Sequence, residues 1–122
     1  MRQNLPVTQR ERTFTDAERL ISTTDLNSKI TYVNDAFVAI SGFSREELVG
    51  QPHNIVRHPD MPPGVFGHMW ETIKQGKPWM GIVKNRCKNG DHYWVSAYVT
   101  PEHQDGARQV LDRLAARATD LN

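Results

Sequence analysis

Strand-forming residues are concentrated in two short runs near the start of the chain. Residues 20–24 and 29–33 are rich in residues that favour β-structure, and residues 25–28 between them favour a turn. The pattern predicts a β-hairpin. The polar residues 1–18 before it show no periodicity, and we expect them to form a flexible cap.

Two short helices are predicted after this hairpin. Asn34 is a typical N-cap, an apolar run follows it, and Gly42 marks the end of the helix. Ser44 and Glu47 have the spacing of a capping box, which predicts that a second helix begins there.

A longer helix follows an irregular segment. Residues 51–63 contain four prolines, so they cannot form one regular helix. From residue 63 to 75 the apolar side chains recur at helical spacing, and Gly76 ends the pattern. This apolar stripe consists of Phe66, Met69, Trp70 and Ile73.

Residues 79–87 and 92–99 predict a second hairpin around Asn89 and Gly90. A two-residue loop would mix polar and apolar residues on both faces, whereas a three-residue loop with Gly90 in a left-handed conformation gives one coherent face. We therefore expect the longer loop, with Asn85 opposite Val95. The predicted inner face carries Trp79, Gly81, Val83, Asn85, Cys87, Tyr93, Val95, Ala97 and Val99.

The C-terminal stretch conflicts with a continued sheet. Residues 107–118 are rich in helix formers, and Val110, Leu111 and Leu114 fall on one side of a helix. Local propensity therefore favours a helix.

The order of these elements is that of a PAS domain, and three stretches make the resemblance specific. They are STTDLNSKITYVNDAFVAISGFSREELVGQPHN, VRHPDMP and KPWMGIVKNRCKNGDHYWV. Together they resemble the FAD-binding PAS domain of bacterial aerotaxis receptors over roughly residues 20–101. The resemblance implies an α+β fold, with a nominally five-stranded antiparallel sheet, short helices on one face and a flavin between them.

The resemblance also implies domain limits and a fifth strand. We expect a cap at residues 1–18, the PAS domain at 19–118 and a tail at 119–122. The family's central fifth strand should occupy about residues 108–116, where this chain has RQVLDRLAA, with Asp112 at an apolar position. Three alternatives stay open: an atypical fifth strand, a helix that leaves the hairpin without its neighbour, or a strand supplied by a partner.

The resemblance gives this chain a set of cofactor residues. A flavin needs an apolar slot for its rings, partners for its polar edge and cations for its phosphates. The amide of Asn85 can both donate and accept at the polar edge, and Arg57 can bind a diphosphate. Asp60 would orient Arg57 or a histidine, because an anion repels phosphate. The candidate residues are Asn34, His53, Arg57, His58, Asp60, Trp79 and Asn85.

Each candidate also has a purely structural interpretation. Asn34 can act only as a helix cap, Trp79 only as a core residue, and Asn85 can bond a neighbouring backbone group. Arg57 and Asp60 can form a surface ion pair of small energy.

Composition and motifs exclude several other functions. The net charge of +1 argues against a nucleic-acid partner, and no apolar run is long enough to span a bilayer. The only cysteine, Cys87, cannot form an internal disulfide, which fits the reducing cytoplasm. It lies outside the segment where light-sensing relatives carry their flavin-reactive cysteine. Neither a hydrolase elbow nor metal-ligand spacing is present, so we expect no enzymatic activity and no metal site.

The sequence thus predicts a cytoplasmic sensory domain, alone or within a membrane-associated receptor, that binds FAD and signals its redox state. The alternatives are a cofactor-free dimerisation module and a haem-based gas sensor. For the latter, His68 lies on the long helix but is expected to face solvent. The outer sheet face is expected to contact a second copy or a downstream signalling region; the alternative is that residues 1–18 fold over it. The residues of this face are Met80, Ile82, Trp94 and Tyr98.

Overall fold

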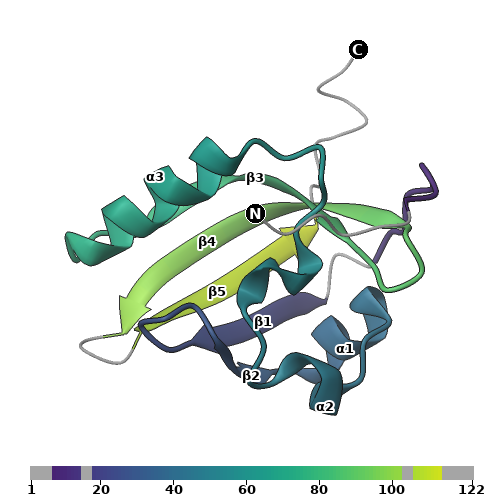
Figure 1. Cartoon of the computed structure of the whole chain (residues 1–122), viewed down its shortest axis with the longest axis horizontal. Helices are drawn as coiled ribbons and strands as arrows, with labels where there is room; N and C mark the ends of the chain where they lie inside the picture. The colour runs from purple at the N-terminus through teal and green to yellow at the C-terminus, as the bar shows by residue number, and fades with distance from the viewer. Residues whose placement is uncertain (1–6, 15–17, 103–105, 114–122) are drawn as a thin grey trace.

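A five-stranded antiparallel sheet with helices on one side forms the domain (Figure 1). The computed structural model describes residues 7–14, 18–102 and 106–113. The strand order is β2-β1-β5-β4-β3, so the last strand in sequence is central. The strands are β1 (Arg19–Thr24), β2 (Ile30–Val33), β3 (Trp79–Arg86), β4 (His92–Glu102) and β5 (Gly106–Arg113). The α+β class predicted from the sequence is confirmed.

The first hairpin is closed by its own turn residues. Asp25 accepts hydrogen bonds at its side chain from the backbone N–H groups of Asn27 and Lys29, and its carbonyl accepts from Ser28. This is an Asx-type turn, in which a short carboxylate replaces backbone partners. The hairpin therefore holds Thr24 and Ser28 at its tip, where they line the same cleft as residues of β5 and of the later helical segments.

Both predicted short helices begin at their predicted caps. Asn34 accepts from the Phe37 N–H at the start of α1 (Asp35–Ser41), and Gly42 ends this helix with φ at 76°. Ser44 and Glu47 form the reciprocal capping box of α2 (Arg45–Leu48). Local chemistry therefore fixes both helix starts.

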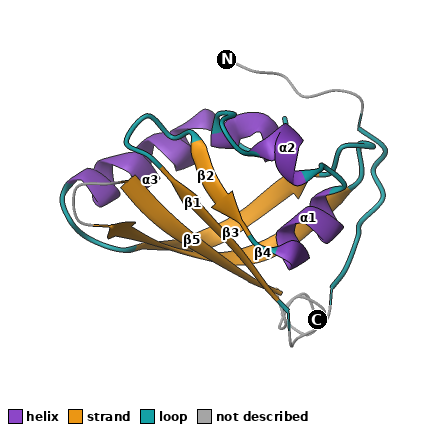
Figure 2. Ribbon diagram, turned by 90° about the horizontal axis from the view of Figure 1, so that it is seen from below, coloured by secondary structure: helices purple, strands orange, loops and turns teal. Residues whose placement is uncertain are grey.

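The proline-rich segment contains only one short 3₁₀ turn, η1 (His53–Val56). It then passes the edge of the sheet, where Arg57 forms an isolated antiparallel bridge with Asn85 of β3. The helix α3 (Pro63–Lys74) follows and lies along one side of the sheet (Figure 2). Met69 and Ile73 of its apolar stripe are buried.

The second hairpin has the predicted three-residue loop, but its register is shifted. Asn85 lies opposite Tyr93, not Val95, so the predicted pairing is wrong. Cys87 and Asp91 close the loop through a 2.7 Å backbone hydrogen bond, which leaves residues 88–90 as the turn. A shift of two residues keeps every side chain on its face, so the predicted inner face is correct.

The C-terminal stretch forms a strand despite its helical propensity. β5 pairs with β1 on one side and with β4 on the other. Of the three alternatives, the atypical fifth strand is correct. Two open neighbours offer this stretch a full set of backbone partners and a buried position, and this outweighs an intrinsic preference of a few tenths of a kcal/mol per residue. Residues 114–116 of the expected strand lie outside the described residues.

Residues 7–14 of the expected N-terminal cap are held against the start of β4. Backbone hydrogen bonds run from Arg12 N–H to the His92 carbonyl and from His92 N–H to the Arg10 carbonyl. Arg12 also donates to the Ile40 carbonyl, and Phe14 joins the buried core. This stretch therefore lies beside the start of β4, before Val95, the first residue of β4 that pairs with β5. The limits at residues 18, 118 and 119 stay predictions.

The two sheet faces differ in character. On the helix side, alternate residues of β3 and β4 form the buried core together with Leu20, Phe37 and Leu111. On the other side Met80, Ile82 and Tyr98 are 72%, 56% and 43% exposed. The described residues therefore leave the apolar outer face open. Within these residues, no helix combines the length and apolar character needed to cross a bilayer.

Candidate functional site

A cleft opens between the sheet and the segment from η1 to α3. Its walls come from both hairpins, from η1, from α3 and from β5. The empty volume of the cleft, including the part open to solvent, is about 640 Å³. The centres of water-sized molecules can occupy about 80 Å³ of this volume. A single water needs about 10–15 Å³ by the latter measure, so side chains of the domain do not fill the cleft. The lining residues are Thr24, Ser28, His53, Asn54, Val56, Arg57, Phe66, Met69, Trp70, Val83, Asn85, Val99, Ala107 and Gln109.

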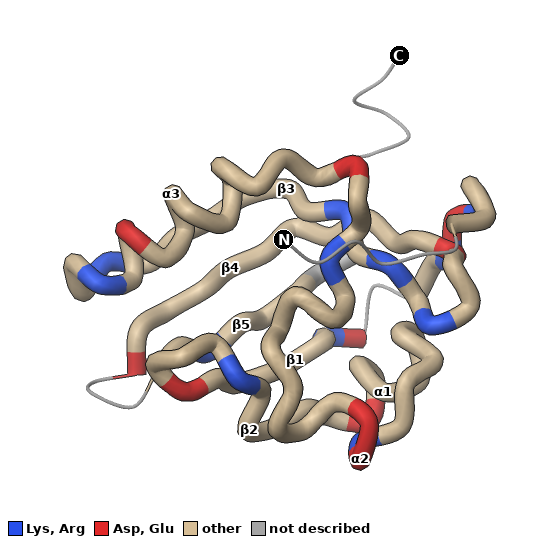
Figure 3. The backbone as a smooth tube through the Cα atoms, in the orientation of Figure 1, with Lys and Arg blue, Asp and Glu red and all other residues tan. Residues whose placement is uncertain are grey.

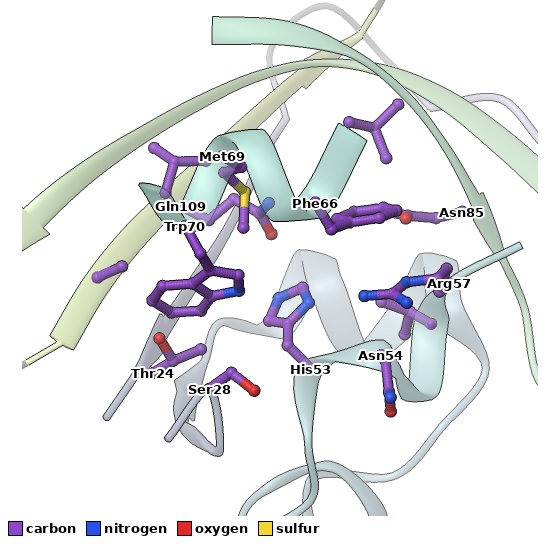
Figure 4. A pocket seen from close by; sticks show the side chains of 14 residues that line it. Thr24, Ser28, His53, Asn54, Arg57, Phe66, Met69, Trp70, Asn85 and Gln109 are labelled. Carbon is purple, nitrogen blue, oxygen red and sulfur yellow. The ribbon is translucent and has the colours of Figure 1, made fainter. Parts of the chain in front are cut away.

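Aromatic side chains from α3 form one wall of the cleft. Phe66 and Trp70 are only partly buried, and both line it (Figure 4). The Arg57 guanidinium lies over the Phe66 ring, 4.1 Å from its centroid, which is a cation–π contact. The sequence predicted these aromatic residues as a helical core stripe. Three of the four residues of that stripe, Phe66, Met69 and Trp70, line open space that a flat, apolar ligand can occupy.

Polar side chains of the sheet form the opposite wall. Asn85 of β3 is 4% exposed, and its neighbouring strand residues Val83 and Val99 are apolar. Thr24 Oγ1 and Gln109 Oε1 are buried in the same cleft, and neither has a hydrogen-bond partner in the described structure. A buried polar atom without a partner costs about 1–3 kcal/mol. These two oxygens can therefore accept hydrogen bonds from a molecule that enters the cleft.

His53 closes the cleft from η1. Its Nε2 lies 3.0 Å from Ser22 Oγ, and its ring packs edge-on against Phe37 at a centroid distance of 6.1 Å. Burial lowers the pKa of His53 to about 4, and the nearby Arg57 cation acts in the same direction. The imidazole is therefore neutral at pH 7.

We expect the stability of the domain to fall between pH 6.5 and about 4. Because the pKa of His53 is lower in the folded state than its ordinary value of 6.5, the unfolded chain takes up the proton first. Between pH 7.5 and 5.5, the unfolding free energy of the unmodified chain should therefore fall by about 1.4 kcal/mol more than that of His53→Gln. Urea unfolding of ligand-free protein at both pH values measures this difference. Parallel pH curves for the two proteins would contradict it. The buried His58, whose pKa is also lowered by burial, contributes equally to both curves.

Three of the predicted cofactor residues line the cleft: His53, Arg57 and Asn85. Asn34 does not; its amide caps α1, accepts from the Ile21 N–H and donates to the Arg19 carbonyl. Its side chain thus joins β1 to α1. Its proposed contact with the cofactor stays a prediction.

Trp79 lies on the inner face as predicted, but outside the residues that line the cleft. Its Nε1–H donates to His68 Nδ1 at 3.0 Å, and its ring covers Gly81 so closely that a Cβ there would come within 2.4 Å of the indole. This contact explains why the strand has a glycine at that position. The hydrogen bond from Trp79 Nε1 also occupies Nδ1 of the exposed His68.

His58 and Asp60 lie on the other side of the β3 edge. His58 is 1% exposed and packs edge-on against His92, which belongs to the outer-face register of β4. Asp60 accepts from Lys84 Nζ at 2.9 Å and lies 3.7 Å from His58 Nδ1. Cofactor contact by these two residues also stays a prediction.

Cys87 is a core residue in this structure. It is fully buried, and its thiol donates to the Ile40 carbonyl at 3.2 Å. Burial raises its pKa to about 11, so it is a protonated thiol at neutral pH.

Sequence reasoning missed the polar residues on the central strands. Gln109 alternates with the buried Ala107 and Leu111, so it shares their face once the stretch is recognised as a strand. Thr24 likewise alternates with the buried Leu20 and Ser22 of β1. Period-two alternation could have found both residues. The helical propensity of the C-terminal stretch concealed Gln109.

The family follows from a comparison with family models. The model described as PAS fold matches residues 30–114, which is more than half of the chain. The chain therefore belongs to the PAS family. Solved structures agree at the level of the fold. The LOV domain of the blue-light photoreceptor Aureochrome1 has a TM-score of 0.72 at 17% identity, covering 86% of this chain and 88% of that one. The LOV domain of the blue-light activated histidine kinase EL346 from Erythrobacter litoralis has a TM-score of 0.66 at 21% identity, covering 75% and 91%.

A curated relative confirms the resemblance to aerotaxis receptors. The chain is 54% identical over 114 residues to the aerotaxis receptor of Escherichia coli (strain K12), which covers 93% of this chain and 22% of that protein. It is 35% identical over 81 residues to the nitrogen fixation regulatory protein of Klebsiella pneumoniae, covering 66% of this chain and 16% of that protein. The chain thus spans about a fifth of the length of these two relatives.

Proposed function

We propose that this PAS domain binds FAD in the cleft and signals the redox state of the flavin to a neighbouring signalling region. The aerotaxis receptor is a relative over nearly the whole chain, and this supports a sensory role of the same kind. The observation that carries the proposal is the cleft itself, in which Thr24 Oγ1 and Gln109 Oε1 are buried without partners opposite an aromatic wall.

The residues present fit a flavin. Phe66 and Trp70 offer flat apolar surfaces to a ring system, and Asn85 offers a donor and an acceptor for its polar edge. Gln109 and Thr24 add acceptors for N–H or O–H groups of the ligand. Arg57 supplies the cation for a diphosphate, and its contact with Phe66 holds it at the cleft.

When bound, a flavin supplies reversible electron transfer, with changes in the protonation and hydrogen bonding of its ring. The chain's part is to convert such changes into a strand movement. Asn85 and Gln109 belong to β3 and β5, and the alternate residues of these strands lie on the outer face. A rotated amide in the cleft therefore acts on the same backbone that carries Ile82 and Val110. We infer that the outer face carries the output contact, to a second copy or a downstream region.

The absorbance spectrum of freshly purified protein tests the function. The proposal expects the two absorption bands of an oxidised flavin, which disappear on reduction and return in air. Denaturing the protein and identifying the released compound then distinguishes FAD from FMN. A Soret band would instead support a haem sensor. A protein that stays colourless after incubation with FAD would support the cofactor-free interaction module.

Asn85→Ala is expected to weaken flavin binding about tenfold. The substitution removes a donor and an acceptor from the cleft, and a tenfold change corresponds to about 1.4 kcal/mol, the upper range for one hydrogen bond. The dissociation constant from flavin fluorescence titration measures this effect. Asn27→Ala, the same change at an exposed turn, serves as the control and should bind as the unmodified chain does. Equal affinity of both variants would remove Asn85 from the site.

A further inference from the structure

The segment that carries Arg57 into the cleft is held by contacts with the outer-face side of β3 and β4. Arg57 bridges Asn85 at the sheet edge, and its guanidinium enters the cleft beside Phe66. The next residues lie on the outer-face side, where His58 packs against His92. The chain therefore crosses the edge of β3 between Arg57 and His58.

Three polar contacts hold this crossing in place. Asp60 accepts from Lys84 Nζ at 2.9 Å, its N–H donates to His58 Nδ1 at 3.1 Å, and the Met61 N–H donates to the His58 carbonyl at 3.0 Å. Figure 3 shows basic positions gathered where this segment passes β3 and β4. The turn from His58 to Met61 is thus tied to one lysine of the sheet.

Lys84 is unusual for its strand. Met80 and Ile82, its neighbours on the same face of β3, are largely exposed, whereas Lys84 is only 8% exposed. Its ammonium group lies 5.6 Å from the centroid of the Trp94 ring and pairs with Asp60. A lysine is almost never buried without a partner, so its burial depends on the carboxylate.

We propose that Lys84, Asp60 and His58 form a clamp that positions Arg57 in the flavin cleft without contacting the flavin. This rests on the proposed function and gives the predicted residues His58 and Asp60 a positioning role in place of direct binding. Lys84, which the resemblance did not single out as a cofactor residue, has the same role. The clamp also joins the cleft to Trp94 on the outer face.

The clamp predicts that a residue outside the cleft controls flavin retention. Lys84→Met keeps most of the length of the unbranched side chain and removes its charge, and we expect flavin to dissociate about tenfold faster, as for the loss of one charged hydrogen bond. Lys84→Arg keeps a cation that can reach Asp60, and it should restore most of the retention. Lys88→Met is the matched control, because it breaks the 2.6 Å ion pair with Glu47 far from the cleft.

A double-mutant cycle tests whether Lys84 acts through Arg57. Arg57→Gln alone should accelerate flavin dissociation, and Lys84→Met should then add little further acceleration, since the guanidinium that it positions is gone. A full additional tenfold effect in the Arg57→Gln background would overturn the proposal. So would a Lys84→Met variant that retains flavin as the unmodified chain does.

Amide hydrogen exchange of the flavin-free protein provides a test that does not depend on the function. Lys84→Met should accelerate exchange in residues 57–61 and leave α1 and β1 unchanged. If the unmodified chain binds no flavin, the proposed function fails, but this local acceleration would still support the clamp. Unchanged exchange in residues 57–61 would overturn the clamp even in a protein that binds flavin well.

Discussion

Gly106→Ala is expected to destabilise the domain by about 3 kcal/mol or more. Gly106 begins β5 with φ at 133°, a conformation that residues with a side chain rarely adopt. A Cβ there would lie 1.8 Å from the Thr24 carbonyl oxygen and 2.7 Å from its carbon. Because these are backbone atoms of the adjacent strand, β1 and β5 would have to separate at the centre of the sheet. Urea unfolding measures the difference in unfolding free energy.

Gly67→Ala is the matched control for this substitution. Gly67 lies inside α3, where an added Cβ meets nothing within 4 Å. The same chemical change should there stabilise the domain by about 0.5–1 kcal/mol, since alanine favours a helix more than glycine does. If both variants gave similar unfolding curves, the close contact between β1 and β5 would be disproved.

Gly106→Ala should also disturb the proposed flavin site, since its contact lies beside the cleft. Thr24 and Ala107, which pair across β1 and β5, both line it. A separation of these strands moves one polar wall relative to Asn85. Flavin affinity of the folded fraction should therefore fall along with stability, which is not expected for Gly67→Ala.

Local sequence signals were sufficient for the elements that are closed by their own residues. Asn34, the capping box at Ser44 and the turn at Asp25 each satisfy backbone groups within a few residues, so the sequence alone indicates them. The four prolines of residues 51–63 likewise indicate an irregular segment without any distant contact. The resemblance to aerotaxis receptors then supplied the five-stranded sheet and the central place of its fifth strand, which no local signal contains.

The register of the second hairpin and the nature of β5 depend on contacts distant in sequence. The face pattern of β3 and β4 is identical for registers that differ by two residues, so it could not place Asn85 opposite Tyr93. For β5, the deciding partners are Arg19–Thr24 and His92–Glu102, at the other end of the sequence and in the preceding hairpin.

The family motifs pointed to part of the cleft lining and not to the rest of it. His53, Arg57 and Asn85 line the cleft as the resemblance implied. The motif could not show that His58 and Asp60 lie across the β3 edge from the Arg57 side chain, because consecutive residues of an extended segment point to opposite sides. Gln109 lies in the stretch that departs from the family, so only the structure brings it to the cleft.

Leu111→Ala is expected to cost about 2–5 kcal/mol, because Leu111 is fully buried and its truncation leaves a cavity. The adjacent Val110→Ala distinguishes the possible structures of this stretch. In a helix, Val110 and Leu111 would share the buried side and both truncations would be costly. In β5 they face opposite sides, and Val110, half-buried on the outer face, should cost no more than about 1 kcal/mol.

The same pair of variants tests whether β5 belongs to its own chain. A strand supplied by a second copy would make the unfolding midpoint depend on protein concentration, since assembly and folding would then be coupled. The pairing of β5 between β1 and β4 of the same chain predicts a midpoint independent of concentration in both variants. Equal costs for Val110→Ala and Leu111→Ala would exclude the central strand on which the polar wall of the cleft depends, whereas a concentration-dependent midpoint would show that folding is coupled to association with a second copy.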